Sequence, residues 1–298
     1  MWQAFDLAKA TFRDFNEDRC PQMAAALSYY TVFSLPPLLI LLLALFGVFV
    51  DPADMRGRIV REMEALLGAD GGKLIDVIIT QANRPGTGVM AVIGVVALLL
   101  GATGAFLQLQ QALNTAWEVR PDPKQGGIKA FIQKRLLSFG MILVVAFLLL
   151  VSFVVAALVS AFGDLLRAWW GSGAAVIAQL VQVAAGLAVT WLLFALMFKF
   201  LPDARISWRD VRFGALVTAV LFTVGRFAIG LYLGRSESAN AFGAAAALAV
   251  LLVWIYYAAN IVLLGAEFTQ VWVRQQGRRL QPEPGAVRTT NAAQRRRG

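Results

Sequence analysis

Several polar side chains in the second half of the chain are surrounded in sequence by long apolar runs. Arg226 carries a guanidinium group deep within one run, and Glu267 carries a carboxyl group in another. Tyr256 and Asn260 share one helical face with Glu267. A cation among apolar residues can bind an anionic group, and an enclosed carboxyl group can bind a proton or a cation. The structural alternative is snorkelling toward the membrane surface, or hydrogen bonding to backbone carbonyls and neighbouring helices.

Two further groups of residues belong to other apolar runs. Gln108, Gln111 and Asn114 lie at the end of one run and could line a substrate or ion pathway, or lie enclosed by protein or headgroups. Pro36 and Pro37 fall near the middle of the first run, where each removes an amide donor and predicts a helix break. Broken helices near the membrane midplane often line transport sites, although a proline kink can also serve packing alone.

The residue types that most hydrolytic chemistry needs are scarce. The chain has no histidine, which excludes a histidine general base and a histidine-ligated zinc centre. Cys20 is the single cysteine, so no internal disulfide is possible. We therefore expect no enzyme, no catalytic residue, no metal site and no cofactor. A carboxylate-held magnesium site stays formally open, but the acids of the loops expected in the cytoplasm are separated: Glu118, Asp122, Asp203 and Asp210.

Six long apolar stretches position these side chains. Each has at least the ~20 residues that a helix needs to cross ~30 Å of hydrocarbon, and none shows the alternation of barrel strands. Because backbone amides must be paired in lipid, we predict an all-α polytopic membrane protein with six transmembrane helices. The expected spans are residues 24–50, 88–109, 136–162, 174–200, 211–233 and 241–273.

The segments outside the spans predict three further features. Residues 1–20 combine aromatic and charged residues at near-helical spacing, which indicates an N-terminal interfacial helix. Residues 53–82 read as an extracytoplasmic (periplasmic) helical hairpin, broken at residues 68–72. We expect residues 1–275 to form a single transmembrane domain and residues 276–298 to form a disordered, basic cytoplasmic tail.

Lys and Arg residues alternate in number from loop to loop. One side of the expected membrane collects 19 of them and the other side collects 7, with Arg226 left inside a span. The positive-inside rule then places both termini in the cytoplasm. Membrane lipids are the expected partners, because each basic residue near an anionic surface contributes ~1 kcal/mol. Nucleic acid is not expected, because no basic module interleaved with aromatic residues is present.

Five segments of the chain carry a resemblance to known proteins. They are residues 24–36, 200–203 followed by Trp208, 214–216, 252–257 and 263–267. These segments resemble the BrkB/YihY family of bacterial inner-membrane proteins. The first segment is similar to the opening span of that family, and the last two are similar to its final span. Together the resemblance covers about residues 10–275.

The resemblance implies a multi-pass protein with six spans in the bacterial cytoplasmic (inner) membrane. It also implies a link to serum resistance and to suspected transport, including the handling of lipid-like molecules. Members of the family have also carried a label as a tRNA-processing ribonuclease of the BN type. The residues of this chain disfavour nuclease activity, because it lacks histidine and a clustered acidic metal site.

The function that we predict is a transporter or permease for an amphipathic, anionic, lipid-like molecule. Arg226 would contact the headgroup, and the face of Tyr256, Asn260 and Glu267 would line the route. The hairpin would cap the route on the outer side. One alternative is a non-transporting membrane scaffold that organises lipids or partner proteins, and the other is the membrane-bound ribonuclease.

Overall fold

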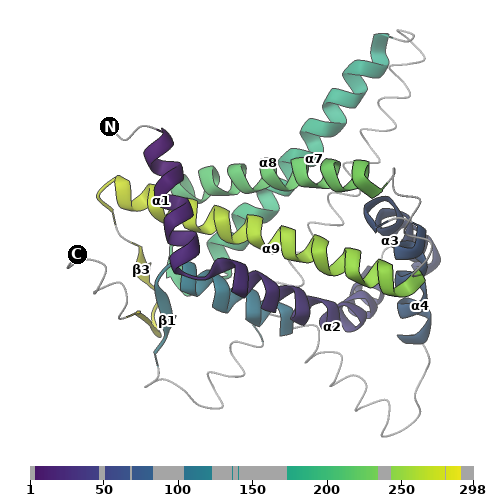
Figure 1. The fold of residues 1–298 in the computed structure, drawn as a ribbon, viewed down its shortest axis with the longest axis horizontal. Coiled ribbons are helices and arrows are strands. Elements are labelled where there is room, and N and C mark those ends of the chain that lie inside the picture. The colour runs from purple at the N-terminus through teal and green to yellow at the C-terminus, as the bar shows by residue number, and fades with distance from the viewer. Residues whose placement is uncertain are drawn as a thin grey trace, which may run out of the picture.

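Helices make up most of the part of the chain that the structure describes (Figure 1). This computed structural model describes residues 4–46, 51–67, 69–82, 104–122, 136, 140, 173–233, 243–278 and 280–289. The helices are α1 (Ala4–Glu17), α2 (Cys20–Phe46), α3 (Pro52–Leu67), α4 (Ala69–Ala82), an unlabelled helix at 104–116, α7 (Gly173–Phe200), α8 (Trp208–Leu233) and α9 (Gly243–Gln275). The all-α fold class is confirmed.

Three of the described helices are long and apolar enough to cross a membrane, within Gln179–Phe200, Trp208–Ala228 and Leu248–Gln275. They correspond to the last three expected spans, and α2 corresponds to the first. The expected spans at residues 88–109 and 136–162 lie outside the described residues, apart from residues 104–109, 136 and 140. The count of six spans therefore stays a prediction.

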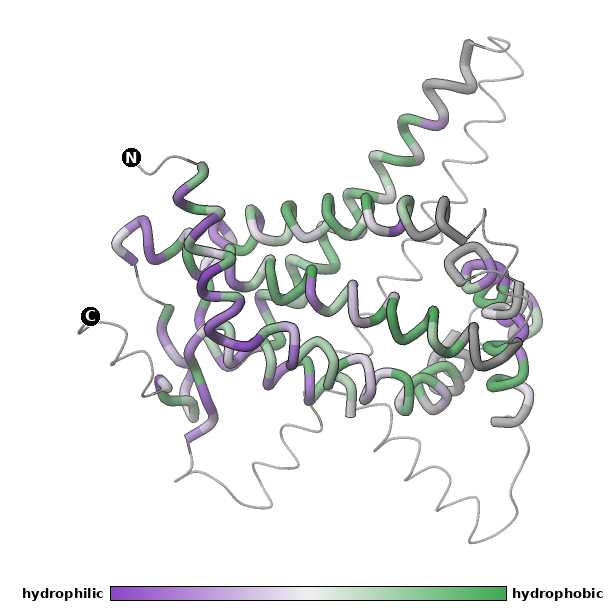
Figure 2. Tube along the Cα trace, in the orientation of Figure 1, coloured by the Kyte–Doolittle hydropathy of each residue, from purple (hydrophilic) through white to green (hydrophobic). Residues whose placement is uncertain are grey.

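The longest helix, α9, lies in the middle of the assembly and contacts α1, α2, α3, α4 and α8 (Figure 1). Apolar residues dominate α7, α8 and α9, whereas hydrophilic residues gather at the end that carries both termini (Figure 2). The hairpin of α3 and α4 lies at the opposite end. The two terminal segments lie at the same end of the molecule. This agrees with the alternating numbers of basic residues in the loops, which place both termini on one side of the membrane. Which end faces the cytoplasm stays a prediction.

Close contact between α8 and α9 depends on a glycine and a threonine in each helix. Gly214 faces Thr269 and Gly265 faces Thr218, and a Cβ atom at either glycine would overlap the facing threonine. Thr218 Oγ1 donates to the carbonyl of Gly214 at 2.8 Å, and Thr269 Oγ1 donates to the carbonyl of Gly265 at 2.7 Å. Each hydroxyl is thus satisfied within its own helix while its side chain fills the space opposite a glycine.

The hairpin packs on α2 through apolar side chains. Met55 of α3 and Ile75 and Ile79 of α4 are buried together with Leu39 of α2. Arg56 of α3 also links the two helices through polar contacts. Its Nε donates to Asp76 Oδ1 at 2.7 Å, and its Nη2 donates to Thr80 Oγ1 at 2.8 Å. The helical hairpin is confirmed, and it is held as one unit by an apolar and a polar contact.

The predicted break of the hairpin at residues 68–72 is too wide. Helix α4 already begins at Ala69, and Gly71 and Gly72 lie buried inside it. A Cβ atom at Gly72 would lie 3.1 Å from Glu64 Cβ of α3. Gly72 therefore permits a close approach of α3 and α4. In a sequence, a glycine that permits close packing cannot be told apart from a glycine that ends a helix.

The helix break predicted at Pro36 and Pro37 is also corrected. Helix α2 runs from Cys20 to Phe46 without interruption. Proline is tolerated in membrane helices where side-chain hydroxyls satisfy nearby backbone carbonyls. Ser34 Oγ donates to the carbonyl of Thr31 at 3.1 Å, which is not one of the two carbonyls, of Val32 and Phe33, that lose their amide donors to the prolines.

The segment that follows α9 forms two short antiparallel sheets with loops far earlier in the chain. The strands are β1 (Val119–Pro121), β2 (Ala204–Arg205), β3 (Gln281–Pro282) and β4 (Ala286–Arg288). Strand β1 pairs with β4, and β2 pairs with β3. The prediction of disorder from residue 276 is therefore wrong up to Thr289. Composition predicted disorder, but backbone pairing with distant strands supplies the order; the residues beyond 289 lie outside the described part.

Helix α1 is amphipathic, as the sequence predicts. Phe5 and Phe12 are exposed on one face, whereas Thr11, Asp14 and Phe15 are buried on the other. The buried face contacts α9 and α2. The exposed aromatic face is typical of a helix that lies in the membrane interface.

Candidate functional site

The predicted stripe on α9 changes its surroundings along its length. Tyr256 is 39% exposed, Asn260 is half-buried, and Glu267 is fully buried at 0% exposure. Asn260 Nδ2 donates to the backbone carbonyl of Tyr256 at 2.8 Å, which is a contact within the helix. Only the Glu267 end of this face is enclosed by other helices.

Glu267 lies where α2 and α9 meet, near the end of helix 104–116. The thiol of Cys20, the first residue of α2, donates to Glu267 Oε1 with a sulfur–oxygen distance of 3.5 Å. Gln270, with its amide nitrogen turned toward the acceptors, donates to Glu267 Oε2 at 3.1 Å and to the carbonyl of Ala116 at 2.8 Å. Trp117 Nε1 donates to the carbonyl of Ala266 at 3.1 Å. These contacts join three helices around one carboxyl group.

Acidic residues of the α1 end surround the same carboxyl group. Asp14 and Asp18 both lie near enough to Glu267 to act on it electrostatically. Asp14 is almost fully buried and pairs with Arg274, whose Nη2 lies 2.6 Å from Asp14 Oδ2. Burial, followed by the charge of Glu267, raises the pKa of the Cys20 thiol, which keeps it protonated as a donor. The arrangement can serve as a proton site or as a structural junction between α1, α2 and α9.

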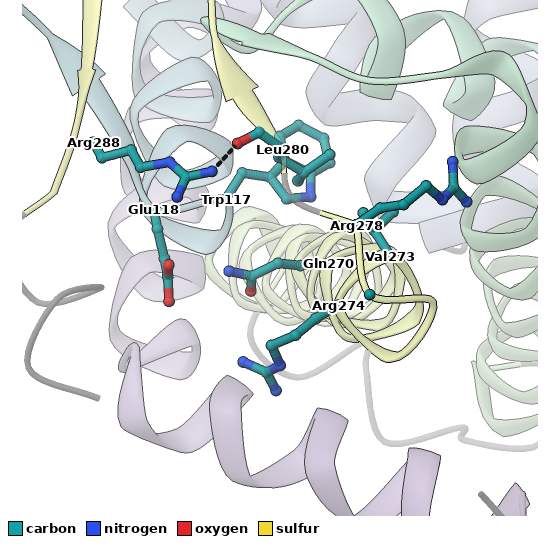
Figure 3. A pocket seen from close by; sticks show the side chains of 9 residues that line it. Trp117, Glu118, Gln270, Val273, Arg274, Arg278, Leu280 and Arg288 are labelled. Carbon is teal, nitrogen blue, oxygen red and sulfur yellow. Dashed lines mark hydrogen bonds between the residues drawn. The ribbon is translucent and has the colours of Figure 1, made fainter. Parts of the chain in front are cut away.

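A pocket of about 300 Å³ lies at the C-terminal end of α9 (Figure 3). Arg278 binds Asp210 through two contacts of 2.5 and 3.0 Å, and Arg288 Nη2 donates to the carbonyl of Leu280 at 2.5 Å. Arg274 is turned toward a third side of the pocket, so the three guanidinium groups do not converge (Figure 3). The carbonyls at a helix C-terminus attract cations and repel anions. Arg274 and Arg278 are paired with Asp14 and Asp210, and Arg288 donates to a backbone carbonyl, so the described contacts of these arginines do not indicate an anion site.

The polar residues of helix 104–116 form a clamp on a distant loop. Gln110 Nε2 donates to Asp203 Oδ1 at 3.1 Å, and Asn114 Nδ2 donates to Asp203 Oδ2 at 2.9 Å. The backbone N–H of Asp203 donates in return to Asn114 Oδ1 at 2.8 Å. Gln108 is half-buried and Gln111 is exposed. The structure thus brings Asn114 to Asp203, which stands in the loop before α8.

Arg226 lies at the other end of the molecule from Glu267, on the part of α8 that faces the hairpin. Its Nη2 lies 3.0 Å from Glu62 Oε2 of α3. Both side chains are largely exposed, at 52% for Arg226 and 64% for Glu62. The sequence placed Arg226 and Glu267 in opposite halves of the membrane, and they have different partners in the structure.

Arg226 also lines a groove of about 330 Å³ between α7 and α8. The polar part of its lining consists of Gln179, Thr190, Thr223 and Arg226. The apolar part consists of Val183, Leu187, Phe222 and Phe227, with Gly186 between them. Sequence reasoning missed the α7 residues, although Gln179 and Thr190 stand out as polar positions in an apolar run.

The two threonine hydroxyls in this groove use their protons within their own helices, so they offer an anion no donor. Thr190 Oγ1 donates to the carbonyl of Gly186 at 2.8 Å, and Thr223 Oγ1 donates to the carbonyl of Ala219 at 2.7 Å. Phe227 is well exposed beside Arg226. The groove therefore combines one cationic group with aliphatic and aromatic surface, which is the chemistry of a site for an amphipathic anion.

Comparison with known proteins decides the family. A family model described as virulence factor BrkB matches residues 11–290. The chain belongs to this family. Curated relatives of this BrkB-family protein are named UPF0761 membrane proteins, which confirms the predicted family and shows an integral membrane protein. No solved structure matches the chain.

The relatives of this BrkB-family protein differ in length. The UPF0761 membrane protein RSc1559 of Ralstonia nicotianae is 31% identical over 87% of this chain and 57% of the relative. A relative from Alkalilimnicola ehrlichii is 31% identical over 86% of this chain and 56% of the relative. One from Psychromonas ingrahamii is 29% identical over 87% of this chain and 84% of the relative. The chain thus spans less than two thirds of the first two relatives.

Proposed function

We propose that this BrkB-family protein is a membrane permease for an amphipathic, anionic, lipid-like molecule that binds in the groove between α7 and α8. One observation carries the proposal: the guanidinium group of Arg226 is exposed in a groove whose remaining surface is mainly apolar. A charged side chain at this depth in a membrane helix is costly unless it has a function or a partner.

The two parts of the groove suit the two parts of such a molecule. The anionic headgroup would bind Arg226, because a guanidinium group can bind carboxylate or phosphate oxygens through two parallel hydrogen bonds. The hydrocarbon chain would lie on Val183, Leu187, Phe222 and Phe227, where removal of apolar surface from water contributes about 25 cal/mol per Å². The volume of about 330 Å³ lies at the lower end of the range of ligand sites.

The remaining assignments of the proposal follow the sequence. In this proposal both termini lie on the cytoplasmic side of a bacterial inner membrane. The hairpin lies on the outer side, near Arg226. Tyr256 and Asn260 would line the part of the route along α9, whereas Glu267, which is fully buried, would lie beside the route and not in it. Surrounding membrane lipids are the neighbours from which a lipid-like substrate would enter the groove sideways.

The test is flux of a fluorescent anionic phospholipid in proteoliposomes. Loss of a charged hydrogen-bonding group costs about 1.5–3 kcal/mol, so we expect Arg226→Ala to lower flux at least about tenfold, with Arg226→Lys in between. Arg212→Ala is the matched control, because Arg212 is an exposed cation at the opposite end of α8. Wild-type flux no faster than in empty liposomes, or equal flux for the Arg226→Ala and wild-type proteins, would reject the proposal.

A further inference from the structure

The side chain of Arg226 takes part in two structures at once. It lines the groove between α7 and α8, and it forms an ion pair with Glu62 of the hairpin at 3.0 Å. Glu62 itself does not line the groove. The same guanidinium group therefore connects the proposed ligand site to the element that lies next to it.

The ion pair between Arg226 and Glu62 is suited to exchange. Both side chains are more than half exposed, and ion pairs in this setting contribute little to stability because water competes with them. The contact joins Nη2 of Arg226 to one carboxylate oxygen of Glu62. A ligand headgroup with two or three anionic oxygens offers the guanidinium group a better match than this contact.

An anionic headgroup and Glu62 would exclude each other at Arg226. Both are negatively charged and both need the same donors, so their simultaneous presence would place like charges within a few ångströms. Displacement of Glu62 would therefore accompany headgroup binding.

Displacement of Glu62 would act on the hairpin as a whole. Arg56 joins α3 to α4 through Asp76 and Thr80, so the two helices move together. The hairpin would stay attached to α2 through the buried cluster around Leu39 and to α9 through Met63, which packs in the cluster around Trp254, while the ion pair with α8 would open.

Resting on the proposed function, we propose that the Arg226–Glu62 ion pair is an autoinhibitory latch. In the ligand-free protein Glu62 engages the guanidinium group of Arg226 from beside the groove. An anionic headgroup in the groove competes for that guanidinium group and breaks the ion pair between the hairpin and α8. Because coupling between two binding equilibria is reciprocal, docking of the hairpin lowers ligand affinity by the same factor by which the ligand weakens docking.

The experiment uses oleate as the anionic probe and oleyl alcohol as its uncharged analogue, added to the full-length protein in neutral detergent. Affinity is measured by titration calorimetry. Movement of the hairpin is measured as the distance between spin labels at Val77→Cys in α4 and Val220→Cys in α8, both exposed positions. Cys20 is fully buried and is not expected to react with the label.

Glu62→Gln is the informative variant, and Glu64→Gln, an exposed acid on the same helix, is its control. We expect Glu62→Gln to raise oleate affinity about two- to fivefold and to broaden the label distance without ligand. Oleate would broaden the distance in the wild-type protein, and oleyl alcohol would not. Glu64→Gln would behave as wild type.

The charge swap Glu62→Arg/Arg226→Glu separates the latch from the ligand site. The swapped pair would hold the hairpin docked, but oleate would neither bind tightly nor change the distance. If oleate binding depends on Arg226 while Glu62→Gln changes neither affinity nor distance, the latch is wrong and the proposed function stands. If Arg226→Ala binds oleate as tightly as wild type, the proposed function itself is wrong.

Discussion

At the end of the bundle that carries both termini, polar side chains are buried and held by several partners each. The fully buried Glu267 accepts hydrogen bonds from Cys20 of α2 and from Gln270 of its own helix, and the half-buried Asp203 accepts from Gln110 and Asn114 of helix 104–116. At the hairpin end, Arg226 and Glu62 are largely exposed and meet through one contact. Buried groups with several partners fix the geometry of a structure, because leaving any of them unsatisfied is costly. An exposed group with one weak partner can exchange it, and this difference is the reason for placing the proposed ligand site at the hairpin end.

The largest change in stability is expected where α8 and α9 are packed most closely. Gly265→Ala would place a methyl group on Thr218 of α8 and should lower the free energy of unfolding by up to about 3 kcal/mol. Unfolding in mixed detergent and dodecyl sulfate micelles, followed by tryptophan fluorescence, measures the change.

Two controls accompany the glycine substitution. Thr218→Ala in the same chain should recover much of the loss, because it removes the hydroxyl that the new methyl group meets. Gly104→Ala should have little effect, since no described atom lies within 4 Å of its Cβ position outside its own helix backbone. Equal effects of Gly265→Ala and Gly104→Ala would break the comparison between a tightly packed and an open end.

A smaller effect is expected for the carboxyl group at the centre of the buried contacts. Glu267→Ala would leave Gln270 and the Cys20 thiol without their acceptor and should cost about 1–3 kcal/mol in the same unfolding assay. Glu267→Gln keeps the shape and one acceptor oxygen, so its cost should be smaller. Similar stability of all three proteins would show that this region does not depend on its hydrogen bonds.

The smallest change in stability is expected for the Arg56–Asp76 contact of the hairpin, and this change depends on pH. The hydrogen bond from Arg56 lowers the pKa of Asp76 below its ordinary value. The contact therefore stabilises the folded hairpin above the unfolded aspartate pKa of about 3.9, and this stability is lost as the pH falls through the lower folded pKa. The melting temperature of Asp76→Asn should lie slightly below that of wild type at pH 7.

The pH dependence itself is the check on this interpretation. The difference in melting temperature between wild type and Asp76→Asn should shrink as the pH is lowered toward 3. A difference that stays constant from pH 7 to pH 3 would mean that the charge of Asp76 does not act through Arg56. The contact between Arg56 and Asp76 would then contribute no pH-dependent stability to the hairpin end.

The helices could be predicted because lipid imposes a local rule on sequence. Helices α2, α7, α8 and α9 each fall on an apolar run, since every backbone group in hydrocarbon must be paired within its own segment. The pairing of β3 and β4 with β2 and β1 could not be predicted in this way. Their partners are distant in sequence, and the strands are only two or three residues long.

The site could be predicted by residue type but not by partner. Arg226 and Glu267 stand out in sequence because a guanidinium and a carboxyl group are rare inside apolar runs. Their contacts with Glu62 and Cys20 join residues far apart in the chain, and no local pattern in the sequence links either pair. The repeated Gly-X3-Thr pattern of α8 and α9 is visible in sequence, but its crosswise match depends on how the helices align.

The strands after α9 tie the last described residues to loops that precede α8 and follow helix 104–116. A chain cut after Gln275 would keep every described helix and lose both sheets, leaving the backbone edges of β1 and β2 open to pairing with another molecule. A purification tag joined beyond Thr289 would spare these strands. Shortened versions of this protein made for crystallisation are therefore expected to associate through these two edges unless they retain residues 281–288.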